Sequence, residues 1–331
     1  MKIISEITYF APTTIEEAVE LLQKHPENSC LLAGGTDVVP ALKKQVEKPR
    51  VIIDLKKISG RIRNIELKTI ENIESIESIE RIESIESKNQ QELFIGTLVT
   101  FCDLLDSALI RENYPLIWEM SKVVASVGIR NRATIVGNIC SAVPCMDSGP
   151  VLLTYDAKVQ TNKRIIPIEN FWIGPRQNCL SIDEIVLGIT IISTSPKSHV
   201  SAGRFVKLMR YRGEDLAQAS IAILINSFES AATATAEVKI AFGAVAPVPI
   251  RAYAIEKIIS KQINQWDEWN EWDQMMEEAL ATIPDIIAPI SDLRASAEYR
   301  LHMVGVMFKR GLKDAILRLQ GNGSKYGSSL I

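Results

Sequence analysis

The stretch Leu32-Ala33-Gly34-Gly35-Thr36-Asp37 decides the fold, because it places two glycines directly after a buried strand. The apolar run from Ser29 to Ala33 predicts that strand. Paired glycines let main-chain N–H groups turn toward a diphosphate, since no Cβ blocks the approach. The two common nucleotide motifs, G-x-x-x-x-G-K-[ST] and G-x-G-x-x-G, are absent from the sequence. The stretch indicates a phosphate-binding loop of a different fold, although a plain turn after a strand is the commoner meaning of paired glycines.

A second stretch, residues 127–150, combines small, amide and hydroxyl side chains with few bulky apolar ones. Such a composition packs poorly as a core, but it suits main chain that lies against a flat ligand. A long structured loop without a ligand would have the same composition. The side chains that could supply polar groups are Thr134, Asn138, Ser141 and Asp147.

Further blocks follow in a recognisable order. They are Arg130–Thr134 through Asp147, Gly174-Pro175 with Asp183–Ile185, Lys207–Arg210, Ala241–Arg251 and Ile290–Arg300. Together with residues 32–37, this order resembles the FAD-binding (medium) subunit of the molybdenum hydroxylases, the family of xanthine dehydrogenase and carbon monoxide dehydrogenase. The resemblance covers nearly the whole chain, and its nearest match is the separate flavin subunit of bacterial xanthine dehydrogenases.

The resemblance implies an α+β fold with two domains. Residues 1–195 would form an FAD-binding domain of the vanillyl-alcohol-oxidase or PCMH type, with subdomains at about 1–56 and 57–195. Residues 202–319 would form a C-terminal domain of the CO-dehydrogenase flavoprotein type, in which a three-stranded antiparallel sheet packs with helices. The glycine- and serine-rich residues 320–331 are expected to be a flexible tail.

Local patterns predict elements that agree with this layout. A helix should follow Thr14, because Thr13 and Thr14 precede Glu16 and Glu17 at capping-box spacing. Further helices are predicted near Val38–Gln45, from Thr100, over Tyr114–Val127, after Arg251 and from Asp292 onward. The predicted strands include Cys30–Ala33, Arg50–Leu55, Phe205–Leu208, Ala219–Asn226 and Val238–Gly243.

Residues 70–90 form a low-complexity insertion, in which isoleucine recurs at every third position between Ile70 and Ser87. On an α-helix this spacing advances about 300° each time, and on a strand it alternates faces, so neither element gains a buried side. We predict a solvent-facing hairpin or a mobile loop. A docking arm for a partner is the functional alternative.

Under the resemblance, two loops would bind FAD. Main-chain donors of the first loop would wrap the pyrophosphate and ribityl chain, and the second loop would form the opposite wall. The first loop comprises Leu31, Leu32, Ala33, Gly34, Gly35, Thr36 and Asp37. The second loop comprises Ala133, Thr134, Ile135, Val136, Gly137 and Asn138.

Four further residues complete the implied cofactor site. Asp147 would bond the polar side of the flavin, and the backbone of Ile185 would hold the adenine. Phe205 and Lys207 stand where the family approaches the isoalloxazine ring. We hypothesise that Lys207 stabilises negative charge on the reduced ring. No residue is assigned a catalytic role, because the flavin itself performs the chemistry.

Val136 departs from the pattern of the family, which usually has Gly-Gly-Asn where this chain has Val136-Gly137-Asn138. Valine adds bulk beside the phosphates and resists a positive φ. Weaker flavin binding or a displaced loop would follow. The surrounding pattern is intact, so FAD binding is still expected.

The composition limits the partners of this chain. A net charge of −3 and a pI of about 5.8 argue against a nucleic-acid surface. No apolar run approaches the ~18 residues of a membrane span, and Met1–Phe10 lacks a signal-peptide pattern, so we expect a cytoplasmic protein. The cysteines contain no C-x-x-C pair and the histidines lie far apart, so no metal is expected on this chain.

The resemblance implies an electron-transfer role within a larger enzyme. A large molybdopterin subunit would oxidise the substrate, and the [2Fe-2S] clusters of a small subunit would pass the electrons to FAD on this chain. NAD⁺ or another acceptor would receive them. The assembly would be a dimer of heterotrimers. A xanthine dehydrogenase-type enzyme is favoured over a carbon monoxide dehydrogenase or an aromatic or heterocycle hydroxylase.

Two readings from other classes remain open. A standalone flavin oxidoreductase similar to the cell-wall precursor reductase would need its own substrate pocket and acid, and the blocks Ala241–Arg251 and Ser291–Arg300 match the hydroxylases instead. A scaffold that has lost its flavin is suggested only by Val136.

Overall fold

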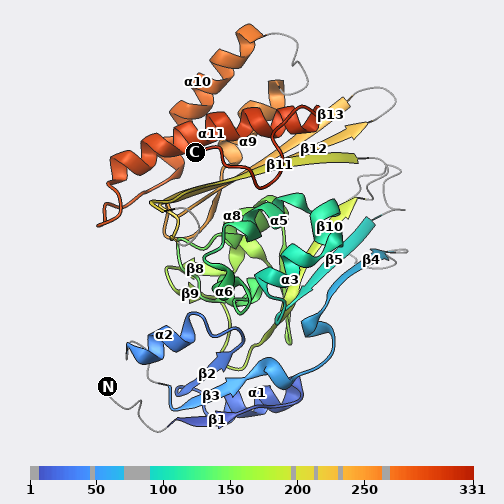
Figure 1. Cartoon of the computed structure of the whole chain (residues 1–331), viewed down its shortest axis with the longest axis vertical. Helices are drawn as coiled ribbons and strands as arrows, with labels where there is room; N and C mark the ends of the chain where they lie inside the picture. Colours follow the sequence, from blue (N-terminus) through green and yellow to red (C-terminus); the bar gives the residue numbers. More distant parts are fainter. Residues whose placement is uncertain are drawn as a thin grey trace.

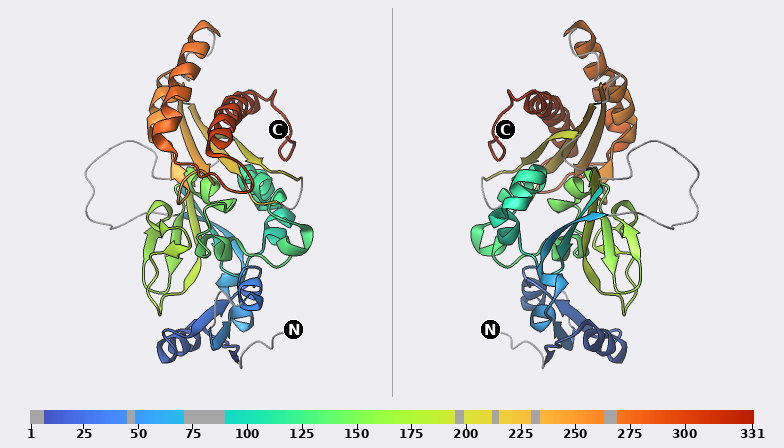
Figure 2. Two further views of the ribbon diagram at one scale, coloured as in Figure 1. Left: turned by 90° about the vertical axis from the view of Figure 1, so that its left-hand side faces the viewer. Right: turned by 90° about the vertical axis from the view of Figure 1, so that its right-hand side faces the viewer.

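The structure is a computed structural model of the 331-residue chain, and it describes residues 7–44, 49–70, 90–194, 199–211, 215–229, 234–262 and 269–331. Three units follow one another along the long axis, from the blue N-terminal unit at one end to the red C-terminal helix near the other (Figure 1). Both side views show the same succession (Figure 2). The prediction for the isoleucine repeat falls outside the described residues.

The first unit is a three-stranded parallel sheet in the order β1-β3-β2, with β3 in the middle. All four residues of β3 are buried, and Ala18 and Leu22 of the first helix pack into the same core. That helix begins after Thr14, whose side chain accepts a hydrogen bond from the Glu17 N–H, so its predicted start is confirmed. The elements are β1 (Thr8–Phe10), α1 (Ile15–Lys24), β2 (Ser29–Leu32), α2 (Val38–Lys43) and β3 (Val51–Asp54).

The second unit is a five-stranded antiparallel sheet in the order β4-β5-β10-β6-β7. Its strands are β4 (Ile65–Ile70), β5 (Gln90–Gly96), β6 (Lys158–Thr161), β7 (Ile165–Pro167) and β10 (Val186–Thr194). A hairpin of β8 (Trp172–Gly174) and β9 (Gln177–Asn178) lies outside this sheet. Its helices are α3 (Phe101–Asp106), α4 (Ala108–Asn113), α5 (Pro115–Lys122), α6 (Val127–Arg130), α7 (Ile135–Cys140) and α8 (Ser148–Thr154). Short 3-10 turns occupy Leu55–Lys57, Arg61–Arg63 and Ile168–Asn170.

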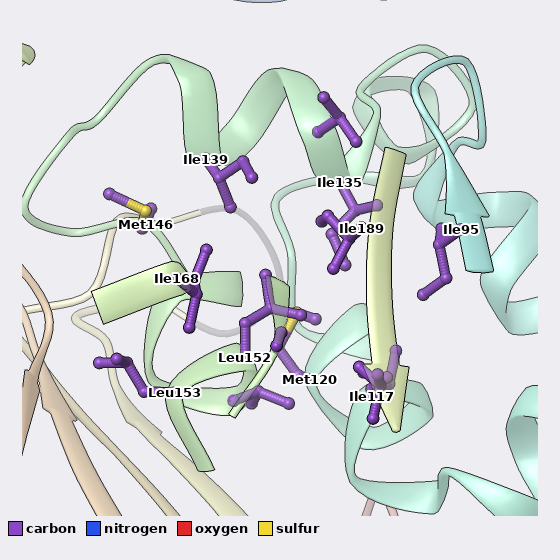
Figure 3. Packing of buried hydrophobic residues seen from close by; sticks show 14 of the residues in the cluster. Ile95, Ile117, Met120, Ile135, Ile139, Met146, Leu152, Leu153, Ile168 and Ile189 are labelled. Carbon is purple, nitrogen blue, oxygen red and sulfur yellow. The ribbon is translucent and has the colours of Figure 1, made fainter. Parts of the chain in front are cut away.

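The core of the second unit is built from isoleucine, leucine and methionine side chains of these helices and of β5 and β10. Figure 3 shows Ile135 and Ile139 pointing from α7 toward Ile189 of β10 and Ile168. All four are almost completely buried. This packing fixes α7, and with it the end of the second loop.

The C-terminal unit is an antiparallel sheet in the order β11-β12-β13-β14. Three long strands are confirmed, and the two-residue β14 adds a short fourth that the sequence did not predict. Helices from this unit pack on one face of the sheet, and α5 and α8 of the second unit pack on the other. The elements are β11 (His199–Leu208), β12 (Ala219–Glu229), β13 (Ala234–Gly243), β14 (Ile250–Arg251), α9 (Tyr253–Gln262), α10 (Trp269–Ile286) and α11 (Ala297–Leu319).

Strand β11 joins the two larger units because its side chains alternate between the faces of the sheet. Val206 and Leu208 belong to the C-terminal core, whereas Phe205 belongs to the core of the second unit. Lys207 follows the same alternation and contacts the second unit. The alternation therefore delivers Lys207 to the site described below.

The last residues of the chain are docked, contrary to the expected flexible tail. The Tyr326 hydroxyl accepts a hydrogen bond from the Gly203 N–H at 3.1 Å, and the Gly327 N–H donates to Glu119 at 2.8 Å. The Arg318 guanidinium lies 3.9 Å from the centre of the Tyr326 ring. Glycine and serine permit this path, but the buried charges on the body of the protein hold it in place.

Candidate functional site

The first loop leaves the sheet where β2 ends and passes directly against the second loop. A Cβ on Gly34 would lie 1.9 Å from the carbonyl oxygen of Arg132 and 3.1 Å from the Cα of Ala133, so only glycine permits this approach. Gly35 has a φ of +79°, in the left-handed region that favours glycine. The two glycines thus serve different needs: Gly34 lets the loops touch and Gly35 makes the turn.

Three consecutive main-chain N–H groups of the first loop, those of Gly34, Gly35 and Thr36, find no acceptor within the described part of the chain. The Gly35 carbonyl accepts a hydrogen bond from Val39 as α2 begins, so the chain beyond the loop is already ordered. Successive unpaired N–H groups in a turn form a concavity suited to an anion. These donors are what a diphosphate requires.

The second loop is fixed by its own capping and by the core beneath it. The Ala133 carbonyl accepts a hydrogen bond from the main chain at the start of α3, 3.0 Å away. Thr134 Oγ1 accepts a hydrogen bond from the Gly137 N–H at 2.9 Å and so begins α7. Ile135 lies in the core. Thr134 is therefore a helix cap here, with its side-chain oxygen already bonded.

Val136 does not obstruct the loop. It has the helical backbone of α7, so the positive φ that valine resists is not required. Its side chain is 2% exposed and belongs to the core of the second unit. The valine that replaces the first glycine of the family pattern is accommodated by that core, and the structure gives no steric reason at this position for weaker flavin binding.

Side-chain bonds connect the first loop, the second loop and the residues that follow. Ser141 Oγ lies 2.6 Å from an Asp37 carboxylate oxygen. Asn138 Oδ1 accepts a hydrogen bond from the Ser148 hydroxyl at 2.5 Å. The two amide hydrogens of Asn138 have no acceptor among the described residues. Ser148 is the direct neighbour of Asp147, so the contacts lead from Asp37 to Asp147.

Asp147 and Lys207 form a buried ion pair, with 2.7 Å between the carboxylate oxygen Oδ2 and the ammonium nitrogen. Their side chains are 9% and 2% exposed. Lys207 also donates to the Val123 carbonyl at 3.0 Å. The other carboxylate oxygen of Asp147 is buried and has no hydrogen-bond partner among the residues that the structure describes. Burial raises the pKa of Asp147, although the Lys207 ammonium acts in the opposite direction.

The remaining two predicted residues lie elsewhere. The Ile185 N–H donates to the Asn162 side chain at 2.8 Å and its carbonyl accepts from the Asn162 N–H, so the N–H is not available to an adenine. The Phe205 ring is buried in the core of the second unit, and its N–H donates to Glu119. Ile185 packs in the core of the first unit and Phe205 in that of the second, and neither presents an unpaired N–H.

Two groups at this site were not predicted. The Val123 carbonyl contributes through the main chain, for which no side-chain signal exists. Glu119 lies on α5 among buried Leu116, Ile117 and Met120, and a carboxylate on that apolar face is the signal that could have revealed it. Glu119 is 3% exposed and forms ion pairs with Arg204 and Arg318, each at 2.9 Å.

The site has unpaired main-chain donors at one end and an unpaired buried carboxylate oxygen at the other. Between them lie the Ser141–Asp37 contact and the Ser148–Asn138 contact, which the second loop and the chain after it connect. This arrangement fits an extended ligand with a negatively charged middle and a heteroaromatic end that carries N–H groups, which are the features of FAD.

Among the described helices, none is both long and apolar enough to cross a membrane.

Comparisons with known proteins identify the family that this chain resembles. Residues 5–74 and 59–191 match the FAD binding domain in molybdopterin dehydrogenase, and residues 204–315 match the CO dehydrogenase flavoprotein C-terminal domain. The chain is 29% identical over 322 residues to the xanthine dehydrogenase FAD-binding subunit of Escherichia coli O157:H7, covering 95% of this chain and 97% of that protein.

Two other proteins show the breadth of the likeness. The nicotinate dehydrogenase FAD-subunit of Eubacterium barkeri is 26% identical over 327 residues, covering 96% of this chain and 99% of that protein. A solved carbon monoxide dehydrogenase of Hydrogenophaga pseudoflava superposes with a TM-score of 0.78 at 26% identity, covering 96% and 99% of the two chains. The chain therefore belongs to the FAD-binding medium subunits of the molybdenum hydroxylase family.

Proposed function

We propose that this chain carries FAD between an iron–sulfur subunit and an external electron acceptor, in an enzyme of the xanthine dehydrogenase type. The observation that supports it is a set of three contacts that lie along the first loop, the second loop and the residues after it: Ser141 with Asp37, Ser148 with Asn138, and Lys207 with Asp147. Unpaired groups of opposite hydrogen-bonding character lie at its two ends.

Each part of the site has a distinct role in holding FAD. The N–H groups of Gly34, Gly35 and Thr36 would donate to the pyrophosphate, and the amide of Asn138 would donate to the polar part between the loops. The unpaired oxygen of Asp147 would accept from an N–H of the flavin ring. When bound, FAD supplies the exchange of single electrons for electron pairs.

Lys207 acts on the ring through Asp147 in this proposal. Two of its three N–H groups donate to Asp147 and to the Val123 carbonyl, which leaves one without an acceptor among the described residues. The Lys207 ammonium balances the charge of the buried Asp147 carboxylate, so a reduced ring beside Asp147 would not face an uncompensated negative charge.

The partners follow from the class of enzyme. A large subunit would hold molybdopterin, a small subunit would hold two [2Fe-2S] clusters, and the whole would be a dimer of heterotrimers. NAD⁺ is the proposed acceptor, with another acceptor as the alternative. The xanthine-type assignment is supported by the likeness to a xanthine dehydrogenase subunit; carbon monoxide dehydrogenases and heterocycle hydroxylases of similar identity are the alternatives.

The two alternatives from other classes, a standalone flavin oxidoreductase and a scaffold without flavin, receive less support. The match of residues 204–315 to the flavoprotein C-terminal domain of CO dehydrogenase disfavours a standalone reductase. The buried position of Val136 removes the only feature that suggested a flavin-free scaffold.

Purification of the native assembly tests the proposal. We expect a yellow protein with the absorbance of oxidised flavin, about one FAD per chain, and iron and molybdenum in the co-purified subunits. Xanthine should then reduce the flavin, and NAD⁺ should reoxidise it. A colourless assembly would refute the FAD role, whereas flavin reduction by carbon monoxide or nicotinate in place of xanthine would refute only the xanthine-type assignment.

A further inference from the structure

A cation from the 3-10 turn after the neighbouring strand β3 contacts the first loop. Lys56 Nζ lies 3.3 Å from the Ala33 carbonyl oxygen, to which it donates a hydrogen bond. The same ammonium lies 2.7 Å from Asp54 Oδ1. The second oxygen of Asp54 accepts a hydrogen bond from the Tyr9 hydroxyl at 2.5 Å. Tyr9, Asp54 and Lys56 thus form a chain of bonds that ends on the main chain of the first loop.

The parallel sheet brings these residues together. β2 and β3 run side by side with Leu32 opposite Asp54, so the first loop and the 3-10 turn after β3 leave the sheet at the same edge. Asp54 caps that turn by accepting a hydrogen bond from the Lys56 N–H at 2.9 Å. The capped turn directs the Lys56 side chain back toward the Ala33 carbonyl.

The direction of the Ala33 carbonyl decides the direction of the next N–H. In a trans peptide the C=O of Ala33 and the N–H of Gly34 lie in one plane and point in opposite directions. Because Gly34 lacks a Cβ, this peptide can rotate at small cost, and its two orientations present either a donor or an acceptor to the ligand. The bond from Lys56 holds the carbonyl on the side away from the ligand, and therefore holds the N–H toward it.

We propose that Lys56 is the positioning residue that keeps the Ala33–Gly34 peptide in the orientation that binds the pyrophosphate of FAD. Because Lys56 acts on the proposed FAD site, its role rests on the proposed function. Lys56 does not itself bond the cofactor; it acts through the peptide that does.

The charge of Lys56 is balanced locally, so its effect is one of orientation. Asp54 is 5% exposed, and burial acts to raise its pKa. Hydrogen bonds from Lys56 and Tyr9 outweigh burial and hold that pKa below its usual value, so the carboxylate stays ionised beside the ammonium. The Lys56–Asp54 pair then adds little net charge to the site. Removing another positive charge nearby should therefore not weaken FAD binding as the removal of Lys56 does.

The sequence offers a matched control in the next residue. Lys57 has the same charge and is exposed, and it makes no bond to the first loop among the described residues. Lys56→Met and Lys57→Met therefore remove equal charge from adjacent positions. Lys56→Arg keeps a long donor with a positive charge and should restore most of the effect.

The experiment is a titration of FAD into the purified assembly after its flavin has been removed. We expect Lys56→Met to weaken FAD binding about tenfold to a hundredfold, the range for a hydrogen bond made by a charged group. Lys57→Met and Lys56→Arg should stay within about threefold of the unaltered protein. The unfolding midpoint of the flavin-free Lys56→Met assembly should fall because Asp54 loses its partner. The midpoint of the FAD-loaded form should fall further, because binding is weakened as well.

Three results distinguish a failure of the proposed Lys56 role from a failure of the proposed function. Equal affinities for Lys56→Met and Lys57→Met, or an Arg variant as weak as the Met variant, would overturn the role of Lys56. An unaltered assembly that binds no FAD would overturn the proposed function itself. If Lys56→Met does not fold, Lys56→Gln, which is polar but too short to reach the carbonyl, makes the same comparison with the same expected loss.

Discussion

Gly34 is the residue at which the first and second loops touch, and its missing Cβ is what allows the contact. Gly34→Ala would place a methyl group 1.9 Å from the Arg132 carbonyl oxygen and push the loops apart. We expect a loss of about 1–3 kcal/mol in the free energy of unfolding and at least a tenfold weaker FAD affinity. Denaturant unfolding and FAD titration measure the two effects.

Gly128 is the control for this prediction, because a Cβ there would meet nothing within 4 Å. Gly128→Ala should stay within about 1 kcal/mol of the unaltered protein and keep its FAD affinity. Equal behaviour of the two alanine variants would show that the loops do not need to touch.

The Lys207 ammonium balances the charge of the Asp147 carboxylate, which has no other partner among the described residues. Lys207→Met would leave Asp147 buried and unpaired, which costs about 3–5 kcal/mol. Asp147→Asn with Lys207→Met should recover part of that loss, because no isolated buried charge remains. We also expect a more negative potential of the bound flavin in Lys207→Met, measured by reductive titration. An unchanged potential would contradict the role of Lys207 at the ring.

Glu184 provides a pH-dependent prediction next to Ile185. It accepts hydrogen bonds from Arg164 at 2.9 and 3.0 Å and from the Thr161 hydroxyl at 2.8 Å. The Arg164 guanidinium lowers the pKa of Glu184 to about 2 from an ordinary value of 4.5. A lowered pKa stabilises the fold above the unfolded-state pKa, and this contribution disappears as the pH falls through the folded-state value.

Glu184→Gln should therefore reduce the free energy of unfolding by about 1–3 kcal/mol at neutral pH. The difference from the unaltered protein should persist down to a pH near 4.5 and vanish as the pH approaches 2. Urea unfolding across this range measures it. A difference that is independent of pH would mean that the charge of Glu184 is not the stabilising feature.

At the scale of elements, α7 shows why the family pattern can change at one position. Thr134 caps this helix, and Ile135, Val136 and Ile139 form its buried face. Valine at 136 therefore contributes to the core while Gly137 and Asn138 keep their places in the second loop. The pattern predicted a conflict because the sequence alone does not say which side of the chain faces the ligand.

Val136→Gly would restore the usual pattern and should still harm the protein. The loss of a buried side chain costs about 1.5–3 kcal/mol and glycine in a helix about 1 kcal/mol more. FAD affinity should not improve. Val136→Ala keeps the helix but shortens the side chain, so its free energy of unfolding should lie between those of Val136→Gly and the unaltered protein. A glycine variant with tighter FAD binding and unchanged stability would show that the side chain does obstruct the site.

Helix α5 and strand β11 are held together by hydrogen bonds that position Lys207 at the site. Glu119 of α5 bonds Arg204 and the N–H of Phe205 on β11, and the carbonyl of Val123 just beyond α5 bonds Lys207. The position of Lys207 is thus set by a helix of one unit and a strand of another. The family resemblance predicted that Lys207 would lie near the flavin ring, but not which groups of this chain it would contact.

At the scale of the whole molecule, the docked C-terminal residues complete a buried group of charges between the second and C-terminal units. Glu119, Arg204, Asp314 and Arg318 form this group, with nitrogen–oxygen distances between 2.9 and 3.4 Å. The tail covers it, and residues 324–328 supply hydrogen bonds to its members.

Deletion of residues 324–331 should expose this group of charges to water. We expect the free energy of unfolding to fall by about 2–4 kcal/mol, because several hydrogen bonds to charged groups are lost. Lys325→Ala in the full-length chain removes only an exposed side chain and should have no effect. Thermal unfolding of both variants measures the difference. An unchanged midpoint after the deletion would show that the tail contributes nothing to stability.

The sequence by itself determined what depends on neighbours along the chain. The cap at Thr14, the strand before the paired glycines and the three long strands of the C-terminal sheet all follow from local patterns, and the order of blocks indicated the family. Only the tertiary structure decided that Val136 faces the core, that the Ile185 N–H is occupied, that Lys207 pairs with Asp147, and that the glycine-rich end is docked. Each of these depends on contacts between residues far apart in the chain, and a local pattern carries no information about which distant group will arrive.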